Sequence, residues 1–216
     1  MASRTLVIVG AHGHGRSVAE AALSAGFVLE CFIDEIARPA FSETLLGFPV
    51  LSSIHDVSSL EDRLFALAVG SNHDRRRIYE RLTQLIRDDQ FPSVIHQTAS
   101  ISRFASIGMG AQILQNASVG SSARVGNFSI VNTNAALDHD ASISDFSRLN
   151  PGVVVGGGAS IGSMTTIGMN ASVADKVTIG DECIVGANSF VRVDLPSHVI
   201  AHGTPADIRN SQTQRE

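Results

Sequence analysis

The sequence predicts an α/β domain of parallel strands followed by a long parallel β-helix. Two observations predict the β-helix. An aliphatic residue recurs every six positions from Ile95 to Val191, and a small residue recurs four positions after it. The α/β domain is predicted by β-branched runs that alternate with amphipathic stretches between residues 5 and 95. Periods of two and of about 3.6 residues distinguish strands from helices, and a fixed longer period indicates a stacked repeat.

The six-residue repeat does not slip once in seventeen hexads. With Ile, Val and Leu at roughly a quarter of ordinary composition, chance agreement is about one in ten billion. The fifth position of each hexad is mostly Ala or Ser and relaxes later to Val153, Val177 and Leu195. Three hexads make one triangular coil, so we expect about five coils. The aliphatic positions are Ile95, Ile101, Ile107, Ile113, Val119, Val125, Val131, Leu137, Ile143, Leu149, Val155, Ile161, Ile167, Val173, Ile179, Val185 and Val191.

Glycine often follows the aliphatic residue of a hexad. We expect these glycines to occupy corners that need unusual φ angles. The repeat itself leaves the hand of the coil open, and the general preference for right-handed crossovers would favour a right-handed one. The glycines concerned are Gly108, Gly120, Gly126, Gly162, Gly168, Gly180 and Gly186.

The first part of the chain reads as alternating strands and helices, which is typical of a small Rossmann-like sheet. We expect strands at 5–9, 27–33, 64–69 and 91–95 and helices at 16–25 and 74–86. The segment 38–62 is less regular, with a turn near Gly47 and a short helix capped at Ser58 or Ser59. The expected domains are 1–92, 93–200 and a tail at 201–216. No flexible linker separates the first two, so we expect them to pack together.

Composition limits the classes of function. A net charge of -5 argues against a nucleic-acid or anionic-membrane surface. The two cysteines, Cys31 and Cys183, form no metal-type pair, and a reducing cytoplasm is the simplest setting. No signal peptide is recognisable, and no apolar stretch approaches the roughly 18 residues of a membrane helix. We therefore expect a cytoplasmic protein without a membrane segment.

A glycine-rich turn follows the first strand. The spacing of Gly10, Gly13 and Gly15 before a helix allows backbone amides to approach a phosphate, or serves only as a tight turn. It is not the dinucleotide fingerprint, so NAD is not expected. Asp34, Gly70 and Asn72 stand at the carboxyl ends of neighbouring strands, where α/β sheets bind ligands. Arg75 beside them is either a ligand contact or a solvated helix charge.

Several motifs resemble one family. The hexads, with VGAHGHGRSVAE, FIDE, AVGSN, NTNAALDHDASI and HGTPA, resemble the left-handed β-helix hexapeptide-repeat acyltransferases over residues 5–209. The branch they resemble contains bacterial sialic-acid O-acetyltransferases and nucleotide-amino-sugar N-acetyltransferases. The resemblance implies a left-handed coil, acetyl-CoA as co-substrate and a homotrimer with sites between subunits. It also implies that Gly10, Gly13 and His14 contact the diphosphate or sugar of the acceptor. Asp34, from its place at the end of a strand, is expected to accept a hydrogen bond from a ribose or uracil.

His139 and Asp140 are the candidate catalytic pair. A lone histidine in a repeat is more often a tolerated polar residue than a catalyst. However, an adjacent carboxylate can orient the imidazole, and the 18-residue coil places Gly157 one rung away from His139. The resemblance further implies that His139 is the general base. We expect direct acetyl transfer, with the Gly157 amide holding the thioester oxygen as it becomes negative.

Other candidates are less specific. Asn132 matches a polar position of the family site, or is a structural residue at a bend. Arg148 stands nine residues after His139, where some amino-sugar members have a second histidine; it meets a carboxylate or phosphate, or coats the surface. The tail segment with Gly203, Pro205 and Ala206 resembles one that lies near the adenine end of the coenzyme, although it could merely end the solenoid.

The alternatives concern the chemistry. Some left-handed β-helices are zinc enzymes, but the histidines His96, His139, His198 and His202 include no suitable pair in the middle coils, so no metal is expected. The predicted function is acetyl-CoA-dependent N-acetylation of a nucleotide-linked amino sugar in glycan synthesis. O-acetylation of a sialic acid or another sugar, and non-catalytic binding of a nucleotide sugar, are the alternatives.

Overall fold

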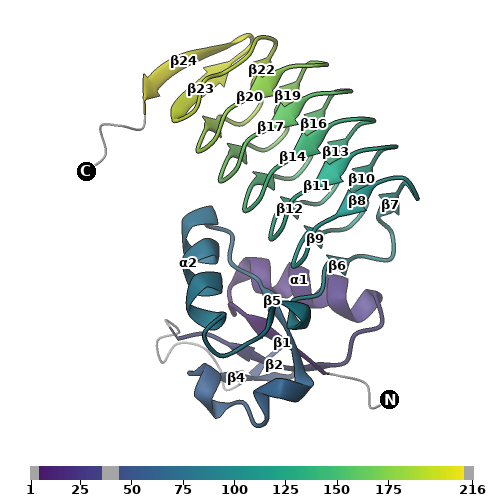
Figure 1. Ribbon diagram of the computed structural model, residues 1–216, viewed down its shortest axis with the longest axis vertical. Coiled ribbons are helices and arrows are strands. Elements are labelled where there is room, and N and C mark those ends of the chain that lie inside the picture. The colour runs from purple at the N-terminus through teal and green to yellow at the C-terminus, as the bar shows by residue number, and fades with distance from the viewer. Residues whose placement is uncertain (1–4, 36–43, 212–216) are drawn as a thin grey trace.

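The computed structural model describes residues 5–35 and 44–211. Figure 1 shows the α/β domain packed beside the first coils of the β-helix, while the hairpin β23–β24 closes the far end. The expected order, an α/β domain followed by a β-helix, is confirmed.

The α/β domain is built on one sheet with the strand order β3-β4-β2-β1-β5. Alternate residues of β1 face opposite sides of this sheet. Leu6 and Ile8 pack in a core with α1, whereas Val7 and Val9 pack in a second core with residues of α2. The elements are β1 (Thr5–Val9), α1 (Gly13–Ser24), β2 (Leu29–Ile33), β3 (Thr44–Leu45), β4 (Phe48–Leu51), the 3-10 helices η1 (Ile54–Asp56) and η2 (Leu60–Asp62), β5 (Arg63–Leu67), α2 (Asn72–Leu82) and η3 (Asp88–Gln90).

Several predicted boundaries in this domain are wrong. The first helix begins at Gly13 and not at residue 16, so Gly13 to Gly15 form its first turn. The second helix begins earlier, at Asn72, and ends at Leu82. In the irregular segment, β3 and β4 pair as an antiparallel hairpin, and Ser59 precedes the short helix η2. Residues 38–43 of that segment lie outside the described residues.

The β-helix consists of two-residue strands in three parallel sheets. Each strand from β6 to β19 pairs with the strand 18 residues later, as Ala136 does with Val154, so three hexads do form one coil. The strands are β6 (Val94–Ile95), β7 (Ser100–Ile101), β8 (Ser106–Ile107), β9 (Gln112–Ile113), β10 (Ser118–Val119), β11 (Arg124–Val125), β12 (Ile130–Val131), β13 (Ala136–Leu137), β14 (Ser142–Ile143), β15 (Arg148–Leu149), β16 (Val154–Val155), β17 (Ser160–Ile161), β18 (Thr166–Ile167), β19 (Ser172–Val173), β20 (Thr178–Ile179), β21 (Ile184–Val185) and β22 (Phe190–Val191). The antiparallel strands β23 (Val199–Gly203) and β24 (Ala206–Ser211) follow.

The core of the prism is the aliphatic column that the repeat predicts. Every predicted aliphatic from Ile113 to Val191 is buried, and the first three are partly buried because the first coil is open at one end. The small residue of each hexad also points inward, as Ala111 and Ala117 do. Each fully buried Val, Leu or Ile stabilises the folded chain by about 1.5–3 kcal/mol.

The glycines after the aliphatic residues do not supply the unusual φ angles. Positive φ falls two residues later, as at Ser122 (φ 60°) and Asp140 (φ 59°). The glycines are needed for a different reason. A Cβ on Gly120 would lie 2.6 Å from the backbone nitrogen of His139 on the next rung. The turn therefore tolerates a side chain in the left-handed region, while contact between rungs excludes one at the glycine.

Arg75 joins the two domains and is fully buried. Its Nε donates to the carbonyl oxygen of Phe128 (2.8 Å) and its Nη2 to that of Phe146 (2.8 Å), on two successive rungs. Its Nη1 donates to the carbonyls of Val69 (2.8 Å) and Gly70 (3.3 Å) in the turn after β5. A solvated helix charge is therefore the wrong interpretation of Arg75, because a planar guanidinium can bond several carbonyls of both domains at once.

Candidate active site

His139 lies on the corner that connects β13 to β14. Its Nδ1 is 2.8 Å from Oδ2 of Asp140, and its side chain is 63% exposed. Asp140 adopts the left-handed conformation, which Asp tolerates better than most residues. An ionised carboxylate only accepts hydrogen bonds, so Nδ1 carries the proton and Nε2 has its lone pair available. This arrangement suits a general base.

Carboxylates around His139 set its basicity. The hydrogen bond to Asp140 raises the pKa of His139, and the negative charge of Asp138 adds to the effect. Asp138 also accepts a hydrogen bond from the His139 backbone nitrogen (2.7 Å). The imidazole is therefore a stronger proton acceptor than a free histidine, and its protonated form persists to higher pH.

Gly157 lies beside His139, on the next rung. A Cβ on Gly157 would stand 2.7 Å from both Cε1 and Nε2 of the imidazole, so any other residue at position 157 would displace the ring from this orientation. The amide of Gly157, however, donates to Oδ1 of Asp175 (3.0 Å). The structure thus brings the two residues together, while the amide already has a partner. Its role as oxyanion donor stays a prediction.

The remaining predicted coenzyme residues lie elsewhere. Asn132 is on the corner before β13, and its Oδ1 accepts from the backbone nitrogen of Thr133 (2.8 Å). Gly203, Pro205 and Ala206 belong to the terminal hairpin, where the peptide bond before Pro205 is cis. Within the part of the chain that the structure describes, no hydrogen bond joins any of them to His139.

A cavity of about 590 Å³ lies in the α/β domain, at the carboxyl ends of β1 and β5. Of the predicted ligand contacts, Gly10, His14, Asp34 and Gly70 line it. Gly13 does not line it, although it is exposed at the start of α1. Packing explains why residue 10 is glycine, since a Cβ there would lie 2.6 Å from the carbonyl oxygen of Ala68.

Asp34 holds the turn between β1 and α1. Its Oδ2 accepts from the backbone nitrogen of Ala11 (2.9 Å) and lies 3.3 Å from Nε2 of His12. The carboxylate is buried and is therefore part of the wall of the cavity.

His14 is tied to the β-helix in a way that determines its tautomer. Gln112 donates through Nε2 to the carbonyl of Leu67 (2.8 Å), so its Oε1 accepts from Nε2 of His14 (2.8 Å). Burial lowers the pKa of His14 to about 4, and the ring is neutral near pH 7. Its Nδ1 is then an acceptor. Of the two predicted contacts, a sugar hydroxyl fits this atom and a phosphate oxygen does not.

Asn72 does not face the cavity, and that part of its prediction is wrong. Its Nδ2 donates to the carbonyl of Met164 (2.9 Å) and contacts Oγ1 of Thr166 (3.1 Å) on the β-helix. Arg148 extends from β15 of the β-helix to the α/β domain, where its Nη1 donates to the carbonyl of Gly70 (2.7 Å). Both side chains belong to the seam between the domains because α2 starts against the outer face of the coils.

Gln112 was not predicted, yet the sequence contains a signal for it. Across two of the three sheets taken together, most outward strand positions are Ser or Thr. On the third sheet, which the α/β domain covers, Thr166 alone in the outward column follows this rule. The column consists of Val94, Gln112, Ile130, Arg148, Thr166 and Ile184.

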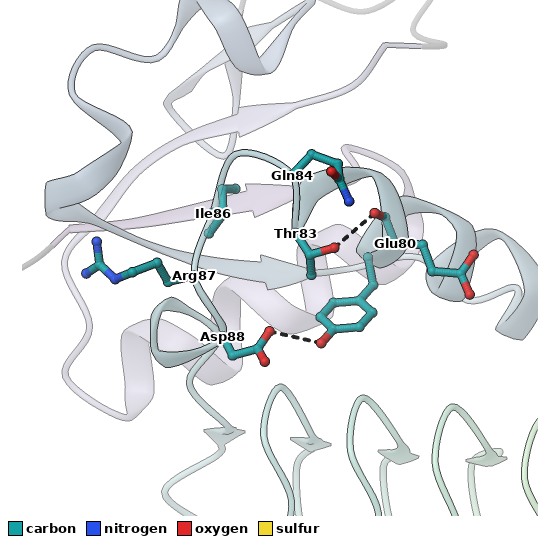
Figure 2. A pocket seen from close by; sticks show the side chains of 7 residues that line it. Glu80, Thr83, Gln84, Ile86, Arg87 and Asp88 are labelled. Atoms are coloured by element: carbon teal, nitrogen blue, oxygen red, sulfur yellow. Dashed lines mark hydrogen bonds between the residues drawn. The ribbon is translucent and has the colours of Figure 1, made fainter.

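A second cavity, of about 550 Å³, lies at the end of α2 (Figure 2). Tyr79 donates to Oδ1 of Asp88 (2.9 Å) there, and burial together with this carboxylate raises the pKa of the phenol. None of the predicted site residues lines this cavity. The cavity at the strand ends is therefore the one that the predicted ligand contacts share.

Residues 5–35 and 44–211 contain no cluster of three or more His, Cys, Asp or Glu side chains placed to hold a metal ion. No helix within this part of the chain is long and apolar enough to cross a membrane.

Comparison with known proteins agrees with this architecture. Residues 5–82 match the model of the PglD N-terminal domain, and residues 158–192 match that of the bacterial transferase hexapeptide. No curated protein sequence matches the chain.

Solved structures resemble the chain over nearly its whole length. The acetyltransferase domain of PglB from Neisseria gonorrhoeae is 32% identical, with a TM-score of 0.88, over 95% of this chain and 100% of that one. The same domain has been solved with acetyl coenzyme A, at 31% identity and a TM-score of 0.87, over 96% and 100% of the two chains. PerB from Caulobacter crescentus, in complex with CoA and GDP-perosamine, is 30% identical with a TM-score of 0.86, over 95% and 97%.

These findings, with the repeat and the His139–Asp140 pair on its corner, define an acetyltransferase built on a left-handed parallel β-helix. The chain belongs to the hexapeptide-repeat acetyltransferases that carry a PglD-type N-terminal domain.

Proposed function

We propose that the protein transfers the acetyl group of acetyl-CoA to the amino group of a nucleotide-linked amino sugar. The observation that carries this proposal is the His139 imidazole, which Asp140 orients at Nδ1 and which leaves Nε2 available. Structures of GDP-perosamine N-acetyltransferase with a histidine replaced hold CoA and GDP-perosamine together, which is consistent with direct transfer between the two substrates.

The proposed step needs no acyl-enzyme. The sugar amine attacks the thioester carbonyl as Nε2 of His139 takes its proton, and the carbonyl oxygen becomes negative. The carbonyl then re-forms as the bond from carbon to sulfur breaks, and the imidazolium of His139 returns its proton to the departing CoA thiolate. Asp140 stabilises the imidazolium that forms. Both cysteines are buried and are not needed as nucleophiles.

The Gly157 amide is our candidate donor to the oxyanion. In this role it exchanges its bond with Asp175 for one to the thioester oxygen. We assign Asn132, Gly203, Pro205 and Ala206 to the coenzyme by family resemblance. The division into a nucleotide-sugar domain at 1–92, a coenzyme domain at 93–200 and a tail at 201–216 is part of the same proposal.

The acceptor would occupy the cavity lined by Gly10, His14, Asp34 and Gly70, with the exposed backbone of Gly13 nearby. Nδ1 of His14 accepts from a sugar hydroxyl in this arrangement. Acetyl-CoA and two unpaired cysteines agree with a cytoplasmic reaction.

We propose a homotrimer, which the family resemblance implies, with sites shared between subunits. The α/β domain covers the sheet that contains β9, β15 and β18. His139 lies between the other two sheets, on the opposite corner of the prism. The prism therefore separates the cavity of a chain from its own His139. We propose that the cavity of one subunit serves the histidine of another.

The test is release of free coenzyme A by the purified full-length protein. The acceptors are of three kinds. The first are amino sugars linked to uridine, guanosine or thymidine nucleotides, the second are the same nucleotide sugars with a hydroxyl group in place of the amine, and the third are free sialic acids. We expect coenzyme A to be released only with a nucleotide-linked amino sugar. Release with hydroxyl sugars or sialic acid would favour O-acetylation. Binding of a nucleotide sugar without any release would replace the enzyme with a non-catalytic binding protein.

A further inference from the structure

The arginines at the rim of the main cavity are paired. Arg77 lies 2.8 Å from Asp74 and Arg81 lies 2.6 Å from Glu35, while the imidazole of His12 lies 3.3 Å from the Asp34 carboxylate. Exposed ion pairs contribute little to stability, but these two leave no unpaired arginine among the described residues of the rim to attract an anion.

Two arginines behind the cavity have no such partner. Arg75 and Arg148 form no ion pair with any described residue, and their hydrogen bonds go to neutral acceptors. Burial lowers the pKa of both, to about 9 for Arg75. Arg75 therefore remains a cation near pH 7, and Arg148 is a cation because arginine side chains stay protonated in proteins. Two uncompensated cations in a buried seam favour an anion within reach.

Arg148 retains a donor for such an anion. Its Nη1 bonds to Gly70 (2.7 Å) and its Nε to Thr166 (3.3 Å). No described residue accepts from its Nη2, which is also not among the buried unpaired atoms and so keeps contact with solvent. The position of a Cβ on Gly70 has only Nη1 of Arg148 within 4 Å, at 3.4 Å. Bare Gly70, a lining residue of the cavity, therefore leaves this guanidinium uncovered.

The start of α1 also borders the main cavity, which His12 and His14 line. This 12-residue helix has no side-chain cap and no acidic residue in its first turn. The start of α2, in contrast, is capped by Ser71 and has Asp74 in its first turn. The first amides of α1 thus lack a side-chain cap, whereas α2 has one, and the nearby Asp34 carboxylate bonds to Ala11, which precedes the helix. His14, in the first turn of α1, senses the positive charges of Arg75 and Arg148, which both lower its pKa.

We propose that Nη2 of Arg148 binds the diphosphate of the acceptor, which lies between this guanidinium and the N-terminus of α1, and that Arg75 positions the turn at Gly70 for it. The inference rests on the proposed nucleotide-linked acceptor and names the residue that recognises its charge. A diphosphate fits better than a single carboxylate because the helix and the arginine offer two separate places for negative charge. Arg148 is then a determinant of specificity for a diphosphate, and not a surface residue.

The test compares nucleoside diphosphates with the matching monophosphates. Uridine and guanosine di- and monophosphates are titrated calorimetrically, at low salt, into the full-length protein and into Arg148→Met, Arg148→Lys and Arg76→Met. Arg76→Met is the matched control, because Arg76 neighbours Arg75 on α2 but is exposed and pairs with Glu80. Acetyl-CoA is titrated in parallel to verify that each variant is folded.

We expect Arg148→Met to weaken diphosphate binding about ten-fold or more and monophosphate binding much less, since one charge-assisted hydrogen bond is lost. Arg148→Lys should lie between, because an ammonium keeps the charge without the planar fork. Arg76→Met should match the unmodified protein.

Two results would overturn the inference: unchanged diphosphate affinity in Arg148→Met, or an equal loss for mono- and diphosphates, which indicates a structural role. Should Arg148→Met not fold, Arg148→Lys provides the same comparison. If the unmodified protein binds no nucleoside diphosphate at all, the proposed function itself fails. That failure is distinguishable from failure of the present inference, in which the unmodified protein and Arg148→Met bind the diphosphate equally well.

Discussion

The two functional regions of this molecule are built by different means. On the β-helix, His139 and Gly157 are 18 residues apart and meet because one coil is 18 residues long. In the α/β domain, the cavity depends on contacts between distant segments. His14 bonds to Gln112, 98 residues away, and Asn72 bonds to Thr166, 94 residues away.

The difference shows how each region tolerates change. A corner side chain such as His139 is exposed and supports no core, so its substitution should affect chemistry alone. The seam contains buried polar groups that satisfy one another across two domains. Loss of one partner there leaves others unpaired, which costs stability as well as function.

The largest expected effect is catalytic. His139→Ala should lower kcat for coenzyme A release about a thousand-fold, because general-base catalysis typically contributes 10²–10⁴. Its melting temperature should be unchanged. His55→Ala, an exposed histidine of the α/β domain, is the control. Turnover within ten-fold of the unmodified protein would contradict the assignment of the base.

The next effect is on stability. Arg75→Met removes all the donors that Arg75 directs to carbonyls of both domains, and should lower the free energy of unfolding by about 3 kcal/mol. Chemical denaturation measures it. Arg76→Met, one residue along the same helix, should cost less than about 0.5 kcal/mol. Equal stability of the two variants would mean that the seam does not hold the domains together.

The smallest expected effect is a shift in pH dependence. The base is active when neutral, so a raised pKa of His139 places the loss of activity on the acid side at higher pH. Asp138→Asn removes a negative charge that raises this pKa while keeping an acceptor for the backbone. The acid limb of kcat should therefore move to lower pH, by less than about one unit.

The control for that shift is Asp62→Asn, on the surface of the α/β domain. Its profile of kcat against pH should coincide with that of the unmodified protein. An acid limb that moves upward in Asp138→Asn, or does not move, would contradict the electrostatic account of His139.

Sequence reasoning succeeded where contacts are periodic. The hexads predicted the coil length, the inward column and the approach of Gly157 to His139. It failed to predict which residues adopt positive φ angles and which must be glycine, because contacts between neighbouring rungs decide this. The glycines were expected to provide unusual φ angles, yet residues such as Asp140 do so, and the glycines prevent clashes between coils.

The sequence by itself determined the solenoid, the order of the two domains and the adjacency of His139 and Asp140, because each follows from local spacing along the chain. Only the tertiary structure decided that Asn72 and Arg75 turn to the β-helix, that His14 is a neutral acceptor, and that the Gly157 amide is bonded to Asp175. The physical reason is that burial and hydrogen-bond partners set the charge and orientation of a polar side chain, and those partners come from segments that no spacing rule connects.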